Sequence, residues 1–416
     1  MLPEKIRLLD VSIGDAPSAG QLIKTSNYEF RYLSTHTDQA AVALFMSPRE
    51  RLTWQDGDLF APMDQTDRRL AKSGDLFMKI RALYPKQPMT PMHLLALVGR
   101  NGIGRLGYSL PNAPVNALPA PLSKTQLIQT RYTPEVFNEL VAAYLSSGAG
   151  IAGMQPKIMV PDRATVPIPS LIVKAASPAY PGLAANEYLC LRAAQRAGIQ
   201  VPSFALSDDG LMLILDRFDM VVHADGHVER LGFEDIAALA GLRVRDVLSD
   251  RKYQGSYQRI AELLRQMQLH SDNLHRFFEQ VAFSVMVRNG DAHLKNFGVL
   301  YRSASEAWLA PMFDVVTTSI YKYTQYPGGP ELEDRTLALK LFAGKHTTRT
   351  YPTTEELLDF GRRICGVSHP EHVIAAIATA MQETLEEAKQ DDRIPKHLLL
   401  QMQTAWEAGL GYATSN

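Results

Sequence analysis

The stretch VRNGDAHLKNFGVLY, residues 287–301, constrains this chain more than any other. In it an apolar run gives way to Asp291, Asn296 follows five residues later, and an extended apolar run comes next. An aspartate in such a loop can accept the proton of an attacking hydroxyl, and an asparagine can give Mg²⁺ a neutral oxygen without repelling phosphates. Because Asn and Asp are also common in turns, the pair alone leaves a capped structural loop as an alternative.

A second acidic residue, Asp314, directly follows an apolar run in WLAPMFDVVTT. Mg²⁺ keeps several of its waters and takes few protein ligands, so two oxygen ligands at strand ends are enough. We therefore expect Asn296 and Asp314 to hold Mg²⁺. A turn aspartate with no metal is the simpler alternative.

Two further stretches indicate phosphate binding. GAGIAGMQPK, residues 148–157, has three glycines that let backbone N–H groups approach phosphate oxygens, although it matches neither a Walker A motif nor GxGxxG. SLIVKAA places Lys174 at the end of an apolar strand, where it needs water or an anionic partner. Glu187 in the next predicted helix can supply one, and an exposed strand-end lysine is the alternative.

These features follow one another in the order found in protein kinases: glycine loop, strand lysine, helix glutamate, Asp291 with Asn296, then Asp314. Unrelated structural roles would have to coincide along one chain to give this order. Upstream, the proline-rich stretch PNAPVNALPAPLS can continue neither a helix nor a central strand. Further helices are predicted near 184–197, ended by Gly198, and through most of the chain beyond about residue 232.

We therefore predict an α+β, bilobal protein-kinase-like fold. It would have a small β-rich N-lobe with an extra N-terminal α/β subdomain and a mainly helical C-lobe. The predicted parts are residues 1–118 for the N-terminal subdomain, 119–231 for the N-lobe with the glycine-rich loop, and 232–416 for the C-lobe with the catalytic loop.

Composition limits the function classes. With 43 basic and 44 acidic residues among 416, the chain has no overall field that attracts nucleic acid. Two cysteines argue against a disulfide framework, and no apolar stretch approaches the roughly 20 residues that span a bilayer. We expect a cytoplasmic protein without membrane contact. His270, His275 and His293 lack a zinc-like spacing. The tyrosines of KYQGSY are expected in the core or in the packing of the lobes, rather than in a nucleic-acid or substrate patch.

Several motifs together carry a family resemblance. They are IAGMQPK, IVKAA, NEYLCLRAAQRAGIQVP, LDRFD, KYQGSY, NGDAHLKNFGVLY, APMFDVVTT and LALKLFAGK. Over most of its length the chain resembles the HipA family of bacterial kinase toxins, and NGDAHLKNF with MQPK is the specific part. The first 110 residues resemble the family's N-terminal subdomain more weakly, mainly through HLLALVGRNGIGRLG.

The resemblance implies an ATP-dependent serine/threonine protein kinase. Asp291 would be the catalytic base, Lys174 would contact the nucleotide phosphates, and Asn296 with Asp314 would hold Mg²⁺. The other implied cofactor-binding residues are Ala152, Gly153, Met154, Gln155, Pro156 and Lys157 in the phosphate loop, Asp216, Arg217 and Phe218 in a hinge that holds the adenine, and His293, Leu294, Lys295 and Phe313.

The resemblance also implies partners: a protein substrate, with an aminoacyl-tRNA synthetase as the candidate, and a helix-turn-helix antitoxin through which alone DNA is bound. Two alternatives stay open, an antitoxin-dependent DNA-binding co-repressor and a small-molecule kinase of the same fold. Several family members carry a serine at the start of the glycine loop whose autophosphorylation silences the kinase. Here Gly150 stands in that place, with Ser146 and Ser147 nearest. We expect no phosphate on residues 148–157 after incubation with ATP and Mg²⁺.

Overall fold

The chain folds into two compact units that alternate along the sequence. The computed structural model describes residues 3–14, 16–34, 40–64, 89–100, 102–113, 123–136, 139–140, 157–161, 169–175, 180–244, 246–324, 331–333, 335–344 and 347–414. The first unit comprises Met1–Ala175, Ile214–Arg251 and Val299–Ala307. The second comprises Ala176–Leu213, Lys252–Gly298 and Trp308–Asn416.

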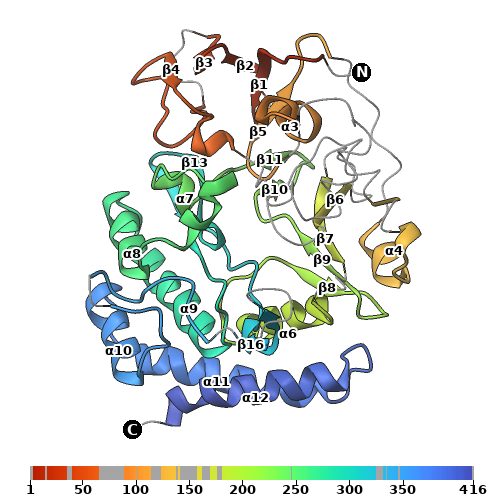
Figure 1. Ribbon diagram of the computed structural model, residues 1–416, viewed down its shortest axis with the longest axis vertical. Helices are drawn as coiled ribbons and strands as arrows, with labels where there is room; N and C mark the ends of the chain where they lie inside the picture. Colours follow the sequence, from red (N-terminus) through yellow and green to blue (C-terminus); the bar gives the residue numbers. More distant parts are fainter. Residues whose placement is uncertain are drawn as a thin grey trace. The chain divides into compact units, whose positions relative to one another are not determined.

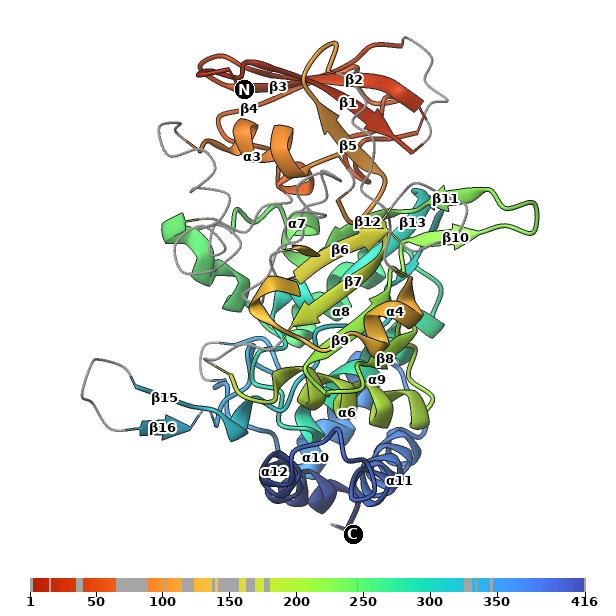
Figure 2. The ribbon, with the colours of Figure 1, turned by 90° about the vertical axis from the view of Figure 1, so that its right-hand side faces the viewer.

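The first unit begins with a five-stranded antiparallel sheet of order β4-β3-β2-β1-β5. Its strands are β1 (Leu8–Ile13), β2 (Ala16–Lys24), β3 (Tyr28–Tyr32), β4 (Thr53–Asp56) and β5 (Leu106–Ser109). Alternate residues of β1 are buried, as expected for a strand with one face on the core. Helix α3 (Pro91–Val98) packs its Met92 and Leu95 into the same core (Figure 2). Thr90 caps this helix by accepting a hydrogen bond from the His93 N–H.

The first unit continues with strands β6 and β7, which pair antiparallel and bring Lys157 opposite Lys174. Strand β9 lies next to β7. Strands β10 and β11 form an antiparallel hairpin (Figure 2). Strands β12, β13 and β14 form a sheet in that order. The bounds are β6 Lys157–Pro161, β7 Pro169–Ala175, β9 Met212–Asp216, β10 Met220–Val222, β11 Val228–Arg230, β12 Gly232–Asp235, β13 Gly298–Ser303, β14 Glu306–Leu309, α4 Lys124–Gln129, α7 Ile236–Leu239, and the short 3-10 helix η1 Ala61–Met63. The 3-10 helix η2 (Asp246–Tyr253) begins in the first unit, and its last two residues, Lys252 and Tyr253, belong to the second.

A buried ion pair ties the N-terminal segment to the rest of the first unit. Arg217 donates from Nε to Asp219 Oδ1 at 2.9 Å, and neither side chain is exposed. Arg217 Nη2 also donates to the Gly102 carbonyl at 2.8 Å, while Asp219 Oδ2 accepts from the Gly104 N–H at 2.7 Å. Arg230 donates to Gly102 O at 2.9 Å as well. Residues 215–219 (LDRFD) therefore hold the glycine-rich segment around Gly102 and Gly104 in place.

A buried carboxylate, Glu234 of β12, also joins distant parts of the first unit. It accepts a hydrogen bond from the Leu44 N–H at 2.7 Å and another from the Tyr301 hydroxyl. Burial raises the pKa of Glu234 to about 7. The buried Arg105 side chain lies near it and donates to the Arg302 carbonyl at 2.7 Å.

The second unit is mainly helical, and α9 lies at its centre. Helix α9 packs against α8, α11 and α12, and α11 and α12 lie side by side (Figures 1 and 2). The bounds are α6 Leu183–Arg196, α8 Tyr257–Gln266, α9 Asp272–Met286, α10 Thr354–Asp359, α11 Pro370–Ala388, α12 Lys396–Thr414, the π-helix η5 Phe360–Ile364, the 3-10 helices η3 Leu294–Asn296 and η4 Thr318–Ile320, and strands β8 Phe204–Leu206, β15 Lys322–Thr324 and β16 Glu331–Glu333.

Helix α12 approaches the end of α9 so closely that the two backbones are in contact. A Cβ atom added to Gly409 would lie 1.9 Å from the Met286 carbonyl oxygen, so only glycine fits there. This contact sits at the last residue of α9, directly before the stretch that carries Asp291. Among the described residues, no helix combines the length and the apolar character that crossing a membrane requires.

Candidate active site

Asp291, Asn296 and Asp314 lie together within the second unit. After α9 the chain turns through Arg288, whose φ is 58°, and passes Asp291 into the short helix η3. Asn296 Nδ2 donates to the Asp291 backbone carbonyl at 2.8 Å and lies 3.5 Å from the Asp314 backbone carbonyl. Because Nδ2 donates to backbone carbonyls, Oδ1 is the Asn296 side-chain atom that can coordinate a cation.

Asp314 has a left-handed backbone with φ 54°. This conformation is costly for a residue with a side chain, though least so for Asn and Asp, and it persists only where the surroundings enforce it. Its carboxylate and the Asn296 amide oxygen are hard oxygen donors, which is the ligand type that Mg²⁺ prefers. The residues present therefore fit a magnesium ion.

The segment after Asp314 is held by its two threonines. The Gly290 N–H donates to Thr318 Oγ1 at 2.7 Å, and that hydroxyl donates to the Arg288 carbonyl at 3.1 Å. One side chain thus fixes the turn before Asp291 to the segment that follows Asp314.

Thr317 is held from the other side, by two helices. Asn186 of α6 accepts from the Thr317 N–H at 2.9 Å and donates to its carbonyl at 3.0 Å, as an amide pairs with a backbone unit. Trp406 of α12 donates from its indole Nε1 to Thr317 Oγ1 at 2.8 Å. All three residues are buried, so the segment has a fixed position within the second unit.

The Asp291 side chain is 45% exposed, and its Oδ1 accepts a hydrogen bond from the Tyr253 hydroxyl at 2.6 Å. His293 Nε2 lies 3.9 Å from the same oxygen, beyond hydrogen-bond range. Burial, followed by the charges of Lys252 and Lys295, holds the pKa of His293 well below its usual value. His293 is therefore neutral, and its approach to Asp291 is not an ion pair.

The two tyrosines of KYQGSY differ in role. Tyr257 is fully buried and donates to the Ala292 carbonyl at 2.9 Å, which confirms the expectation that it lies in the core. Tyr253, by contrast, is half-buried and contacts the Asp291 carboxylate. A lone tyrosine in a short motif gave no signal for that contact, because the two residues are 38 positions apart.

The predicted phosphate-binding residues of the first unit are only partly described. Ala152, Gly153, Met154, Gln155 and Pro156 lie outside the described residues, as do Ser146, Ser147 and Gly150. Lys157 opens β6, and Lys174 on β7 is 4% exposed. Glu187 on α6 of the second unit is buried too. The ion pair between Lys174 and Glu187 stays a prediction.

The predicted hinge residues have partners within the first unit. Asp216 ends β9 and pairs with Lys124 Nζ at 2.8 Å. Arg217 gives its backbone N–H to the Ser170 carbonyl at 2.8 Å, and the Phe218 ring lies edge-on to Phe233. Adenine binding at this segment stays a prediction, and it would have to use backbone groups other than the Arg217 N–H.

The remaining predicted site residues lie beside Asn296 and Asp314 in sequence. Leu294 is buried within η3, whereas Lys295 and Phe313 are half-buried. Their contact with a nucleotide also stays a prediction.

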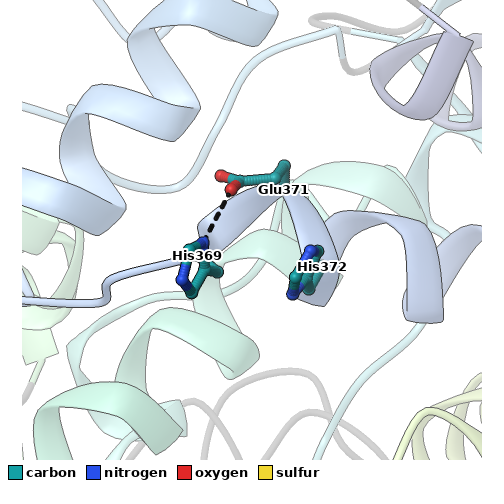
Figure 3. A group of neighbouring side chains, drawn as sticks. All are labelled: His369, Glu371 and His372. Carbon is teal, nitrogen blue, oxygen red and sulfur yellow. Dashed lines mark hydrogen bonds and ion pairs between the residues drawn. The ribbon is translucent and has the colours of Figure 1, made fainter.

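A different cluster has the spacing of a metal site (Figure 3). His369, Glu371 and His372, at the start of α11, have ligand atoms within 4.8 Å of one another. However, Glu371 already accepts from Arg362 at 2.9 Å and contacts His369 Nδ1 at 3.2 Å. A helix N-terminus also carries partial positive charge that opposes a cation. These interactions account for the cluster without a metal.

The model of the HipA-like C-terminal domain matches residues 149–389, more than half of the chain. The chain belongs to this family. The resemblance to HipA proteins predicted from the motifs is thereby confirmed. This HipA-like chain is 27% identical over 219 residues to a "Putative kinase" of Haemophilus influenzae, covering 49% of the chain and 60% of the relative. It is 29% identical over 167 residues to the "Putative kinase Y4dM" of Sinorhizobium fredii, covering 36% and 38%.

The HipA-like chain thus spans less than two thirds of the length of these relatives. Among solved structures, it is similar to a chain of the Shewanella oneidensis toxin–antitoxin complex of HipA, HipB and operator DNA. The match covers 97% of this chain and 96% of that one, with a TM-score of 0.64 and 15% identity. At this identity the match establishes the fold, and the predicted α+β, kinase-like fold class is confirmed.

Sequence reasoning missed the residues that hold the HipA-like site in place. Asn186, Thr317 and Thr318 all lie inside motifs that carry the family resemblance, NEYLCLR and APMFDVVTT. Their presence there was the available signal. What each one contacts could not be read from spacing, because Asn186 and Thr317 are 131 positions apart.

Proposed function

We propose that this chain is an ATP-dependent serine/threonine protein kinase, the toxin of a toxin–antitoxin module. The observation that carries the proposal is the Asn296 amide, which bridges the backbone carbonyls of Asp291 and Asp314. Phosphoryl transfer needs a base for the acceptor hydroxyl next to oxygen ligands for magnesium, and these three residues supply both. Membership of the HipA-like family and its relatives' names support the same reaction class.

Each residue has a defined task in this proposal. Asp291 accepts the proton of the attacking serine or threonine hydroxyl. Asn296 Oδ1 and the Asp314 carboxylate would hold Mg²⁺, which would neutralise phosphate charge when bound. Lys174 contacts the nucleotide phosphates from β7, with the backbone of residues 152–157 as the phosphate loop. Positioning and charge neutralisation carry the rate, since the protein has no covalent step to perform.

Transfer of label from radioactive ATP into a bacterial lysate tests the reaction. We expect one or a few labelled protein bands with the wild-type chain and Mg²⁺. Asp291→Asn should abolish the label while leaving the melting temperature unchanged, because an amide of the same size cannot act as the base. A labelled band of equal strength with the variant contradicts the assignment, and label in a small molecule alone indicates a small-molecule kinase instead.

The partners belong to the same proposal. The labelled protein would be the substrate, and we propose an aminoacyl-tRNA synthetase for it. We also propose a helix-turn-helix antitoxin through which the chain reaches DNA, supported by the likeness to a HipA chain whose complex contains HipB and operator DNA. The near-neutral charge gives the chain little affinity for DNA by itself. A gel shift of operator DNA by the isolated chain at physiological salt would instead favour a DNA-binding co-repressor.

A further inference from the structure

We propose that Tyr253 is a positioning residue for the base Asp291, an inference that rests on the proposed function. The Tyr253 hydroxyl donates to Asp291 Oδ1 at 2.6 Å. That length is typical of a hydrogen bond from a neutral hydroxyl to an ionised carboxylate, which is stronger than a bond between neutral groups. Both residues belong to the second unit.

Tyr253 is held in place by its own surroundings. Its ring lies edge-on to His293, with 5.3 Å between centroids and an angle of 72°. The ammonium of Lys252, a side chain only 4% exposed, lies 5.0 Å from the Tyr253 ring centroid. The hydroxyl is therefore presented by an anchored ring rather than by a surface side chain that samples many rotamers.

The chain that follows Tyr253 is anchored as well. Gly255 turns it with φ 99°, and Ser256 then caps α8 by accepting from the Arg259 N–H at 3.2 Å. The Tyr257 N–H donates to the Lys340 carbonyl at 2.9 Å. These hydrogen bonds therefore hold the backbone on the C-terminal side of Tyr253 in a defined position.

A phenol suits the task better than the neighbouring groups. A half-exposed carboxylate rotates about its Cβ–Cγ bond, and a fixed donor to one oxygen removes this freedom before the acceptor arrives. His293 lies too far from Oδ1 at 3.9 Å. A lysine in its place would add a full positive charge and make the carboxylate a weaker base. The neutral hydroxyl orients Asp291 with less loss of basicity.

The test compares two tyrosine-to-phenylalanine variants, each of which removes one hydroxyl. In Tyr253→Phe, we expect kcat for label transfer into the main labelled lysate protein to fall about tenfold. KM for ATP and the melting temperature should stay as in the wild type, because Tyr253 acts through the base and not on the nucleotide.

Tyr412→Phe is the matched control. Tyr412 is buried and donates to the Pro352 carbonyl at 2.6 Å in the same unit. Loss of this hydrogen bond in Tyr412→Phe should lower the melting temperature and leave kcat unchanged. A Tyr253→Phe enzyme with full kcat, or one that loses activity only in step with its melting temperature, overturns the inference while the proposed function stands. A wild-type chain that transfers no phosphate to any acceptor overturns both.

Discussion

Burial favours the neutral form of two titratable side chains, one in each unit. For His293 the neutral form leaves a ring that packs against Tyr253 without repelling Lys252 and Lys295. For Glu234 the neutral form carries a proton at pH values where an exposed glutamate has lost it. The first unit therefore loses free energy of unfolding whenever Glu234 is forced to ionise.

This predicts a pH dependence of stability. The pKa of Glu234 is about 7 in the folded protein, against an ordinary glutamate value of 4.5 in the unfolded chain. The stabilisation by the neutral form is complete below pH 4.5 and is lost as the pH rises to about 7. Its size is about 3 kcal/mol for a shift of this order. Urea unfolding at pH 5 and pH 8 should show the loss in the wild type and much less of it in Glu234→Gln. Equal pH dependence in both proteins would refute the role of Glu234.

At the scale of secondary structure, the elements that carry the site were predictable where local chemistry decides them. The helix predicted over 184–197 is α6, Leu183–Arg196, and Gly198 follows it with φ 82°. The contacts between elements were not predictable, because they join residues far apart in sequence. Nothing in the local sequence of α12 indicates that Gly409 meets the end of α9 and that Gly411, two positions on, meets nothing within 4 Å.

These two glycines give a paired prediction. Gly409→Ala should lower the free energy of unfolding of the second unit by about 2 kcal/mol or more, because its methyl group overlaps the Met286 carbonyl. Gly411→Ala lies in the same helix with open space around it and should raise stability by roughly 0.5 to 1 kcal/mol through helix propensity. Thermal unfolding of both variants measures the difference. Two variants of equal stability would contradict the close approach of α12 to α9.

At the scale of the whole molecule, the two units are assembled from alternating stretches of the chain, an arrangement that the linear sequence did not reveal. The boundaries predicted near residues 118 and 231 stay predictions. What the sequence did give was the kinase-like order of motifs, since each motif is set by local chemistry. Long-range pairs such as Arg217 with Gly102 depend on the complete fold and have no local signal.

A chain that begins at residue 119 should not fold properly. Without the N-terminal segment, Arg217 and Arg230 lose the Gly102 carbonyl, and Glu234 loses the Leu44 N–H. Each buried group left without a partner costs about 1 to 3 kcal/mol. We expect insoluble or unfolded protein, judged by soluble yield and circular dichroism beside the full chain. A soluble fragment with the melting temperature of the full chain would mean that residues 1–118 are dispensable.

The hydrogen bond from Trp406 places an intrinsic fluorophore against Thr317, which stands three residues after Asp314 in the sequence. Indole emission shifts with the polarity and hydrogen bonding around the ring, so any displacement of this segment changes the optical signal of the unlabelled protein. Titration with nucleotide and magnesium, with Trp54 and Trp308 replaced by phenylalanine, would then follow the segment from Asp314 to Thr318 in real time.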